Sequence, residues 1–384
     1  MAGAAFGYAP LWTALASFPL MAAVQLMCAR LGMVTGLGLA GVIRRRYSRW
    51  VLWSACLLLV VANVINIAAD LGGMAEATQM VTGLPAALSV PIYAGVIVGL
   101  LMWSSYRSIA RVFKWLTLVL LAYVVTAFVA HVDWRLALRM TLIPHVEWSR
   151  PFFSVLVAIL GTTISPYLFF WQAAQEVEEE RAMGRNLAKR RGATHQELTD
   201  CRTDVMTGMF ASNAIMYFII LTTAATLHAH GQTSIATARE AAEALRPVAG
   251  AGAYWLFTLG LIGTGFLAVP VLAGSCAYAV AEAAAWRGSL DRRPNRARKF
   301  YGVLAVAMAL GIGLNYAGLN AIALLFTTAV INGVLAPPLI LIVLLLTNDK
   351  KVMGPAVNSR PLALFGWLAF AVMVAAVLGL ALAT

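Results

Sequence analysis

The sequence predicts an all-α integral membrane protein in which about ten spanning helices form one bundle domain over residues 1–384. Composition is the first observation behind this prediction. The 384-residue chain is 61% hydrophobic and only 11% charged, whereas soluble domains carry about 25% charged residues. The second observation is that apolar runs of about 18 or more residues, long enough to cross the hydrocarbon core, recur along the whole chain.

Ten apolar segments are expected to span the membrane. They lie at residues 9–29, 50–80, 88–103, 107–130, 152–180, 203–227, 252–283, 300–316, 319–346 and 362–382. Four cysteines (Cys28, Cys56, Cys201, Cys276) are scattered without paired spacing, so disulfide and zinc sites have little support. Membrane hydrolase signatures, such as His-Glu-x-x-His or Gly-x-Ser-x-Gly, do not occur, which argues against an enzyme.

The positions of Lys and Arg orient this bundle. Of the 28 basic residues, 23 fall in one set of alternate loops and 5 in the other. Cytoplasmic loops are enriched in Lys and Arg, so the first set is predicted to be cytoplasmic. The net charge of +12 therefore reports topology, and no nucleic-acid partner is expected. Ten spans place both termini outside, and we expect that a helix preceding the first span is missing from this sequence.

The span at 50–80 carries polar residues at membrane depth. Asn63, Asn66 and Asp70 are spaced to share one helical face. An ionisable residue at that depth is costly and by default marks an ion or proton path. A buried structural hydrogen bond is the alternative for Asp70. Glu76 lies nearer the outer end and is expected to be solvated.

The span at 152–180 is predicted to be interrupted. As one helix it would extend about 43 Å, beyond the ~30 Å hydrocarbon core. Pro166 has no N–H, and Ser165 before it is disfavoured in the α region. We therefore expect two half-helices that meet at an unwound segment, residues 162–167, near mid-membrane. Free backbone carbonyls at that depth are typical of ion sites in secondary transporters. A proline kink whose backbone is satisfied by Ser165 or Thr162 is the alternative.

Three further segments give weaker signals. Small residues in the span at 252–283 favour close helix packing. In the span at 319–346, Asn332 and Gly333 precede Pro337–Pro338, and these residues predict a second interruption of a helix. Asn332 would either bind a cation there or cap the kink. The acids at 176–180 are expected to form a solvated face paired with arginines, with a cation exit vestibule as the alternative. The outer pair His228 and His230 is expected to be solvated and metal-free.

The segments FGYAPLW, INIAADLG, GTTISPYL and LTNDKKVMG, in this order of spans, resemble the natural resistance-associated macrophage protein (Nramp) family. The resemblance covers nearly the whole chain from Gly3 and is strongest to a divergent bacterial subgroup. It implies a multi-pass divalent-metal transporter of the bacterial inner membrane, with a LeuT-like inverted-repeat bundle of eleven helices, the first missing here. Residues 9–130 would form an incomplete first repeat, residues 151–346 the second repeat, and residues 362–382 an extra C-terminal helix.

Departures from the family pattern fall in the predicted site. The family's first-helix Asp-Pro-Gly-Asn motif is absent, and its Met-Pro-His-Asn sequence is replaced by 165–168, which reads Ser-Pro-Tyr-Leu. Ala329 stands where the family has a metal-contacting glutamine, and Gly73 where it has a second acid. Asp70 matches the family's proton-path aspartate, and Thr162 matches a residue whose backbone carbonyl binds the ion.

The resemblance and its departures together predict a site of oxygen ligands from Thr162, Ser165, Tyr167 and Asn332, with Asp70 on a proton path. Oxygen ligands suit a hard ion, so Mg²⁺ or Mn²⁺ is expected over Fe²⁺, carried by alternating access. The ion is the substrate, and no cofactor is expected. An amino-acid or other organic-substrate carrier of the same architecture and a non-transporting remnant are the alternatives. The expected partners are the ion and the lipid bilayer, and the sequence does not decide between a monomer and a homo-oligomer.

Overall fold

The computed structural model describes residues 1–103, 111, 115, 118–184, 193–286 and 288–383, and all regular structure among them is helical. This confirms the all-α prediction. Among these residues, eight helical segments are long and apolar enough to cross a membrane, or nine if a pair bent by 118° at residues 118–142 counts as one. The predicted span at 107–130 lies partly outside the described residues. The predicted span at 300–316 forms a helix that begins with the charged pair Arg298–Lys299 and is not among the eight.

The helices follow one another without strands in the part of the chain that the structure describes. The α-helices are α1 (Ala2–Phe6), α2 (Trp12–Thr35), α3 (Leu39–Arg46), α4 (Arg49–Thr82), α5 (Ala86–Trp103), α7 (Leu121–Val129), α8 (Trp134–Leu142), α9 (Arg150–Thr163), α10 (Pro166–Ala182), α11 (His195–Thr226), α12 (Ala238–Glu243), α13 (Arg246–Ala249), α14 (Ala253–Ala283), α15 (Arg298–Asn315), α16 (Ala321–Asn348), α17 (Lys350–Met353) and α18 (Arg360–Leu382). Short 3₁₀ turns lie at Ala9–Leu11, Leu118–Leu120, His228–His230, Gly250–Gly252, Pro294–Arg296 and Gly354–Ala356.

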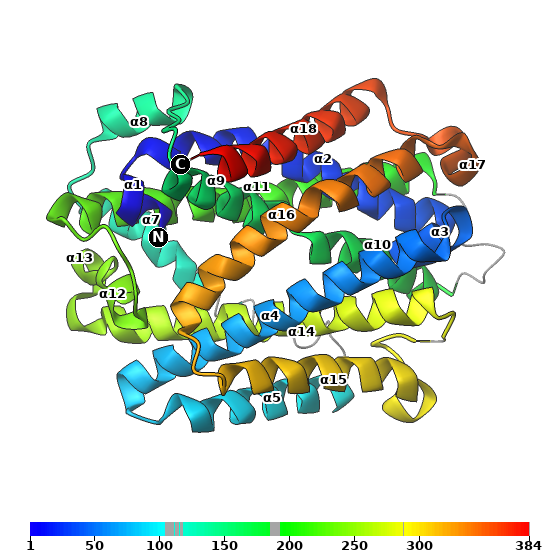
Figure 1. Ribbon diagram of the computed structural model, residues 1–384, viewed down its shortest axis with the longest axis horizontal. Coiled ribbons are helices and arrows are strands. Elements are labelled where there is room, and N and C mark those ends of the chain that lie inside the picture. The colour runs from blue at the N-terminus through cyan, green and yellow to red at the C-terminus, as the bar shows by residue number, and fades with distance from the viewer. Residues whose placement is uncertain (104–110, 112–114, 116–117, 185–192, 287, 384) are drawn as a thin grey trace.

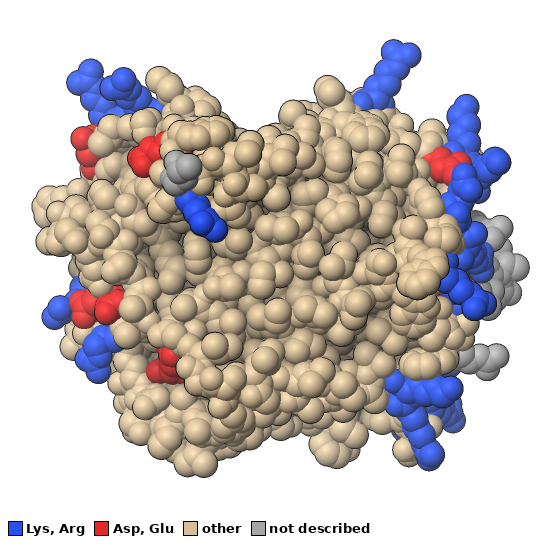
Figure 2. Space-filling model, viewed as in Figure 1, with Lys and Arg blue, Asp and Glu red and all other residues tan. Residues whose placement is uncertain are grey.

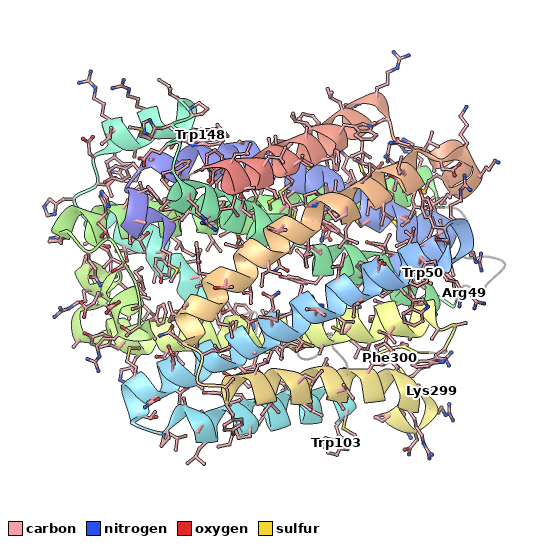
Figure 3. All side chains as sticks on the ribbon, viewed as in Figure 1. Arg49, Trp50, Trp103, Trp148, Lys299 and Phe300 are labelled. Carbon is pink, nitrogen blue, oxygen red and sulfur yellow. The ribbon has the colours of Figure 1, made fainter. Side chains whose placement is uncertain are left out.

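The charged side chains mark the two ends of this bundle. The long helices run between a left and a right end in Figure 1, with α16 crossing obliquely over the middle. Figure 2 shows that Lys, Arg, Asp and Glu gather toward the two ends, and a broad band between them carries none. Arg49, Trp50 and Lys299 lie at the right end, and Trp148 lies at the left end (Figure 3). The right end, with α3 and α17, therefore holds residues of the predicted cytoplasmic set.

Close helix contacts at small residues hold the centre of the bundle together. An added Cβ at Gly265 of α14 would lie 2.2 Å from the sulfur of Met74 in α4. Between α9 and α16, a Cβ on Gly161 would lie 2.1 Å from the Ala329 carbonyl oxygen, and one on Gly333 would lie 2.4 Å from the Val157 carbonyl oxygen. Backbones can approach this closely because glycine has no side chain. The small-residue packing predicted for α14 is present.

The second interruption predicted from Asn332, Gly333 and Pro337–Pro338 is wrong. The helix α16 is continuous from Ala321 to Asn348 and contains both prolines. A spanning helix tolerates proline where the bond that is lost can be compensated by neighbouring helices. Asn332 does not cap a kink, because its amide pairs with Asn66 of α4 across the helix interface.

One expectation about acidic residues is also corrected, whereas Glu76, expected to be solvated, is half-buried. The Glu76 carboxylate accepts a hydrogen bond of 3.3 Å from the Ala321 backbone N–H, where the N-terminus of α16 favours negative charge. Glu178 and Glu180 of α10 are buried rather than solvated. The expected pairing with an arginine is present, because Glu178 bonds to Arg181, and Glu178 also accepts from the hydroxyl of Ser289 at 2.6 Å.

Several polar contacts lie near the ends of the spans. The Arg46 guanidinium donates a 2.6 Å hydrogen bond to Asp349, and this bond holds the pKa of that carboxyl below its ordinary value. The rings of His228 and His230 hydrogen-bond to backbone carbonyls of Ala4 and Thr226. Among the described residues no group of His, Cys, Asp or Glu is placed to hold a metal ion.

Candidate metal site at the helix break

The predicted break is present and is shorter than expected. Helix α9 ends at Thr163 and α10 begins at Pro166, so only two residues leave the helical conformation, rather than 162–167. Ile164 has φ −109° and ψ 59°, and Ser165 has φ −79° and ψ 131°. The extended backbone of Ser165 is the conformation that a following proline imposes. The break therefore follows from the local sequence.

The missing N–H of Pro166 changes the hydrogen bonding of the last turn of α9. In a continuous helix that N–H would bond to the Thr162 carbonyl four residues earlier. The hydroxyl of Ser165 stands in its place, 2.9 Å from the Thr162 oxygen and 2.6 Å from the Gly161 oxygen. Ser165 itself is buried. The structure combines the two interpretations of this segment. The helix is interrupted, as the first interpretation predicts, and the hydroxyl of Ser165 bonds to the backbone carbonyls, as the second predicts.

Hydroxyl groups cover the rest of this turn as well. Thr162 and Thr163 each donate from the side chain to the Ile159 carbonyl at 2.9 Å. Threonine commonly makes such bonds to the preceding turn of its own helix. The Ile159 oxygen therefore accepts hydrogen bonds from side chains of its own helix. The Thr162 oxygen differs, because Pro166 denies it a backbone donor.

A cavity of about 540 Å³ opens beside the break. From α9 and α10 it is lined by Thr162, Tyr167 and Leu168, and from α16 by Ala329, the position at which the sequence departs from the expected glutamine. The first residues of the chain reach the cavity because Gly3 lets α1 pack closely on α11. Thr162 is exposed to this space, and Tyr167 is half-buried. Thr162 and Tyr167, predicted from the sequence, thus share one cavity.

Residues that the sequence analysis did not single out also line this cavity. Asn213 of α11 is buried, donates to the Ala14 carbonyl and accepts from the hydroxyl of Ser17 at 3.3 Å. Four methionines are among the residues that line the same space: Met1, Met21, Met209 and Met216. The amide of Asn213, near the middle of the span at 203–227, was a signal that the sequence offered. The methionines gave none, because methionine is common in apolar helices.

Asn332 of α16 and Asp70 of α4 are not among the residues that line the cavity. The amides of Asn332 and Asn66 exchange two hydrogen bonds of 3.3 Å each, and Asn332 is 3% exposed. Asp70, one helical turn beyond Asn66, is half-buried. Its carboxylate makes no hydrogen bond or ion pair with the residues described. Asn63 was predicted to share the face of Asn66 and Asp70, but it contacts a different helix and donates to the Leu272 carbonyl of α14 at 3.0 Å.

Comparison with known proteins decides the family. A family model described as natural resistance-associated macrophage protein-like matches residues 1–383. The chain belongs to the Nramp family. The family predicted from the sequence is thus confirmed, and with it a family of transporters rather than enzymes.

Two relatives give the extent of the likeness. This Nramp chain is 27% identical over 382 residues to the divalent metal cation transporter MntH of Mesorhizobium japonicum, covering 97% of this chain and 81% of the relative. It is 31% identical over 271 residues to the divalent metal cation transporter MntH of Xanthomonas campestris pv. campestris, covering 68% of this chain and 59% of that relative.

Solved structures agree with the fold. The manganese transporter of Eremococcus coleocola, in complex with an aromatic bis-isothiourea compound, superposes with a TM-score of 0.73 at 20% identity, covering 97% of this chain and 80% of that one. A nucleobase-cation-symport-1 family transporter superposes with a TM-score of 0.56 at 14% identity, covering 99% and 88%. At these identities the likeness shows the fold alone. It confirms the LeuT-like bundle for this Nramp chain; the repeat boundaries at 9–130 and 151–346 stay predictions.

Proposed function

We propose that this Nramp chain carries a divalent metal cation, Mg²⁺ or Mn²⁺ in preference to Fe²⁺, across the bacterial inner membrane by alternating access. Two relatives bear the name divalent metal cation transporter, and one matched structure is a manganese transporter, which supports the class of substrate. The observation that carries the proposal is the break in α9–α10, where a carbonyl without a backbone donor lies beside a cavity.

The proposed ligands are oxygen atoms at the break. The Thr162 carbonyl lacks the N–H of residue 166, and Tyr167, the second residue of α10, lines the cavity. Oxygen ligands suit hard ions, and Mg²⁺ keeps several waters for which the cavity has room. Asn332 stays a predicted ligand that would first have to exchange its amide partner Asn66 for the ion. Asp70 stays a predicted member of a proton path, placed one turn from that amide pair.

Methionine residues that line the cavity also bear on which ion the site prefers. Four methionines line the space, and their thioethers would favour softer ions: Met1, Met21, Met209 and Met216. None of the four belongs to the break itself, where oxygen is the donor type available. We therefore expect the hard ions to be preferred, with the methionines acting as apolar wall.

Competition among metals in proteoliposomes tests this proposal. Purified protein is reconstituted, and uptake of Mn²⁺ is measured in the presence of increasing Mg²⁺, Fe²⁺ or Cd²⁺. The expected result is that Mn²⁺ enters and that Mg²⁺ competes at lower concentrations than Fe²⁺ or Cd²⁺. Preference for Cd²⁺ or Fe²⁺ over Mg²⁺ would reject the hard-ion assignment, and no uptake of any metal would reject divalent-metal transport.

An organic-anion carrier is the second candidate, and one observation favours it. The side chain of Ser165 makes no capping bond to α10, so the N-terminus of this 17-residue helix is uncapped by that side chain beside the cavity. Helix N-termini favour carboxylates. Uptake of radiolabelled amino acids into the same proteoliposomes discriminates between the two. Accumulation of a labelled amino acid without metal transport would favour the second candidate.

A further inference from the structure

We infer that Ser165 controls access of the cation to the Thr162 carbonyl by competing with the cation for that oxygen, rather than by serving as its ligand. This inference rests on the proposed function and assigns a positioning role to one residue of the site. Its basis is the placement of a single hydroxyl between two carbonyl oxygens, 2.6 Å from Gly161 O and 2.9 Å from Thr162 O.

The hydroxyl has a single hydrogen to give to these two carbonyls. A serine side chain has one donor hydrogen, and both neighbouring oxygens are acceptors. Ser165 is 1% exposed, so water does not supply a second donor from its side of the turn. Thr162, in contrast, is exposed to the cavity. When the hydrogen points to Thr162, that oxygen is occupied, and when it points to Gly161, the Thr162 oxygen has no donor from Ser165.

This switch has a direct consequence for cation binding. A cation approaching the Thr162 oxygen repels the hydroxyl hydrogen, which then rotates toward the Gly161 oxygen. The Ser165–Thr162 bond present in the empty site is lost on binding, so the hydroxyl stabilises the empty state and weakens cation affinity. Because the second acceptor is close, the displaced hydrogen still has a partner, and the site can empty and refill without a buried donor left unpaired.

Replacement of Ser165 distinguishes the two roles by the sign of the effect. If the hydroxyl were a ligand, its removal would weaken binding. If it competes, Ser165→Ala strengthens binding, and the half-saturating concentration of Mn²⁺ falls about two- to threefold. This is less than the factor for one full net hydrogen bond, because the bond to Gly161 is kept when the cation binds. Ser165→Thr restores a hydroxyl on the same carbon and is expected to return the value to that of the unmodified protein.

The matched control is Ser154→Ala. Ser154 lies near the start of α9 and donates to the Arg150 carbonyl at 2.9 Å, a serine–carbonyl bond of the same kind but remote from the break. We expect no change in the half-saturating concentration for this variant. An effect equal to that of Ser165→Ala would assign the change to general loosening of α9 and overturn the inference.

The experiment measures Mn²⁺ uptake into proteoliposomes and, separately, Mn²⁺ binding to the purified protein by titration calorimetry. If Ser165→Ala does not yield folded protein, Ser165→Cys replaces it, because a thiol is a weaker donor of similar size, and the affinity is again expected to rise. An unchanged or weakened affinity in a folded variant overturns the role of Ser165 while leaving the proposed function intact. Absence of both uptake and binding in the unmodified protein overturns the proposed function itself.

Discussion

A single absent N–H group sets the chemistry at the helix break. Proline at 166 leaves the Thr162 carbonyl without its helical donor, and the side chain of Ser165 takes up part of that loss. Two residues outside the helical conformation suffice to place this oxygen beside a cavity of about 540 Å³. The proposed metal site therefore depends on residue identity at two adjacent positions.

Restoring the absent donor is expected to impair transport. In Pro166→Ala the new backbone N–H can bond to the Thr162 oxygen, and a cation must then displace it. We expect the half-saturating concentration for Mn²⁺ to rise about two- to tenfold, measured by uptake into proteoliposomes. The matched control is Pro151→Ala, which replaces the exposed proline at the start of α9 and should leave uptake unchanged. Normal uptake by Pro166→Ala would show that the break is not needed for the site.

The carboxylate of Asp70 offers a second test at this scale. A negative charge at membrane depth without an ion-pair partner among the described residues attracts a cation or proton strongly. For Asp70→Asn, which keeps the size and removes the charge, we expect the initial rate of Mn²⁺ uptake to fall about ten- to a hundredfold. Asp349→Asn, at the surface pair with Arg46, is the control. Full activity in Asp70→Asn would assign Asp70 a structural role.

At the scale of helices, the contact between α9 and α16 fixes where the break lies. Gly161 meets the backbone of Ala329 and Gly333, and Gly333 in turn meets Val157. Because Gly161 immediately precedes the Thr162 carbonyl, this contact holds the last turn of α9 against a continuous helix. The broken helix is thus supported by one that is not broken.

A methyl group at Gly161 is expected to separate these helices. In Gly161→Ala the Cβ would lie 2.1 Å from the Ala329 oxygen and 2.4 Å from the Gly333 nitrogen, so backbone must shift. We expect a loss of stability of about 1–3 kcal/mol, as for other overpacked contacts, read as a lower Tm in detergent together with reduced uptake. Gly302→Ala in α15, where an added Cβ meets no atom within 4 Å, should be as stable as the unmodified protein or slightly more so. Equal Tm values for the two variants would contradict this account of the contact.

Prolines show what the sequence can and cannot predict about these helices. Pro166 follows Gly161–Ser165, a run that contains weak helix formers. The helical hydrogen bond lost at Pro166 is therefore not offset by favourable helix propensity nearby, and the break was predictable. Pro337 and Pro338 lie in an apolar run packed against α9 and α4, and α16 stays continuous. The difference lies in the neighbouring helices, which a single-sequence pattern does not contain.

The site was predictable in part for the same reason. Thr162 and Tyr167 were predicted because they adjoin the break and match positions of the family motif. The Asn66–Asn332 pair joins residues 266 positions apart, and each amide alone allows either a ligand or a structural interpretation. The contributions of Met21, Met209 and Asn213 to the cavity depend on how α2 and α11 pack, which their own sequences do not reveal.

At the scale of the whole molecule, the uneven distribution of basic residues predicts how the protein is oriented in the membrane. Of the 28 basic residues, 23 belong to the loops assigned to the cytoplasm. Figure 2 shows an uncharged band between a right end rich in Lys and Arg and a left end with charges of both signs. The N-terminus and the end of α18 lie toward the left end in Figure 1, so both termini are on the predicted outer side.

Labelling of introduced cysteines tests this orientation. Arg135→Cys and Arg293→Cys, both at exposed positions, are each introduced into a Cys201→Ala background, since the other three native cysteines are buried. In intact cells a membrane-impermeant maleimide is expected to label residue 135 and not residue 293, and lysis should expose both. Labelling of residue 293 alone in intact cells would invert the topology.

The location of a bound ion tests the central claim most directly. An X-ray structure of the protein crystallised with Mn²⁺, phased with the anomalous signal of the metal, is expected to show one peak at the break, about 2.0–2.6 Å from the Thr162 carbonyl oxygen. A peak elsewhere in the bundle, with the Thr162 oxygen still bonded to Ser165, would contradict the account.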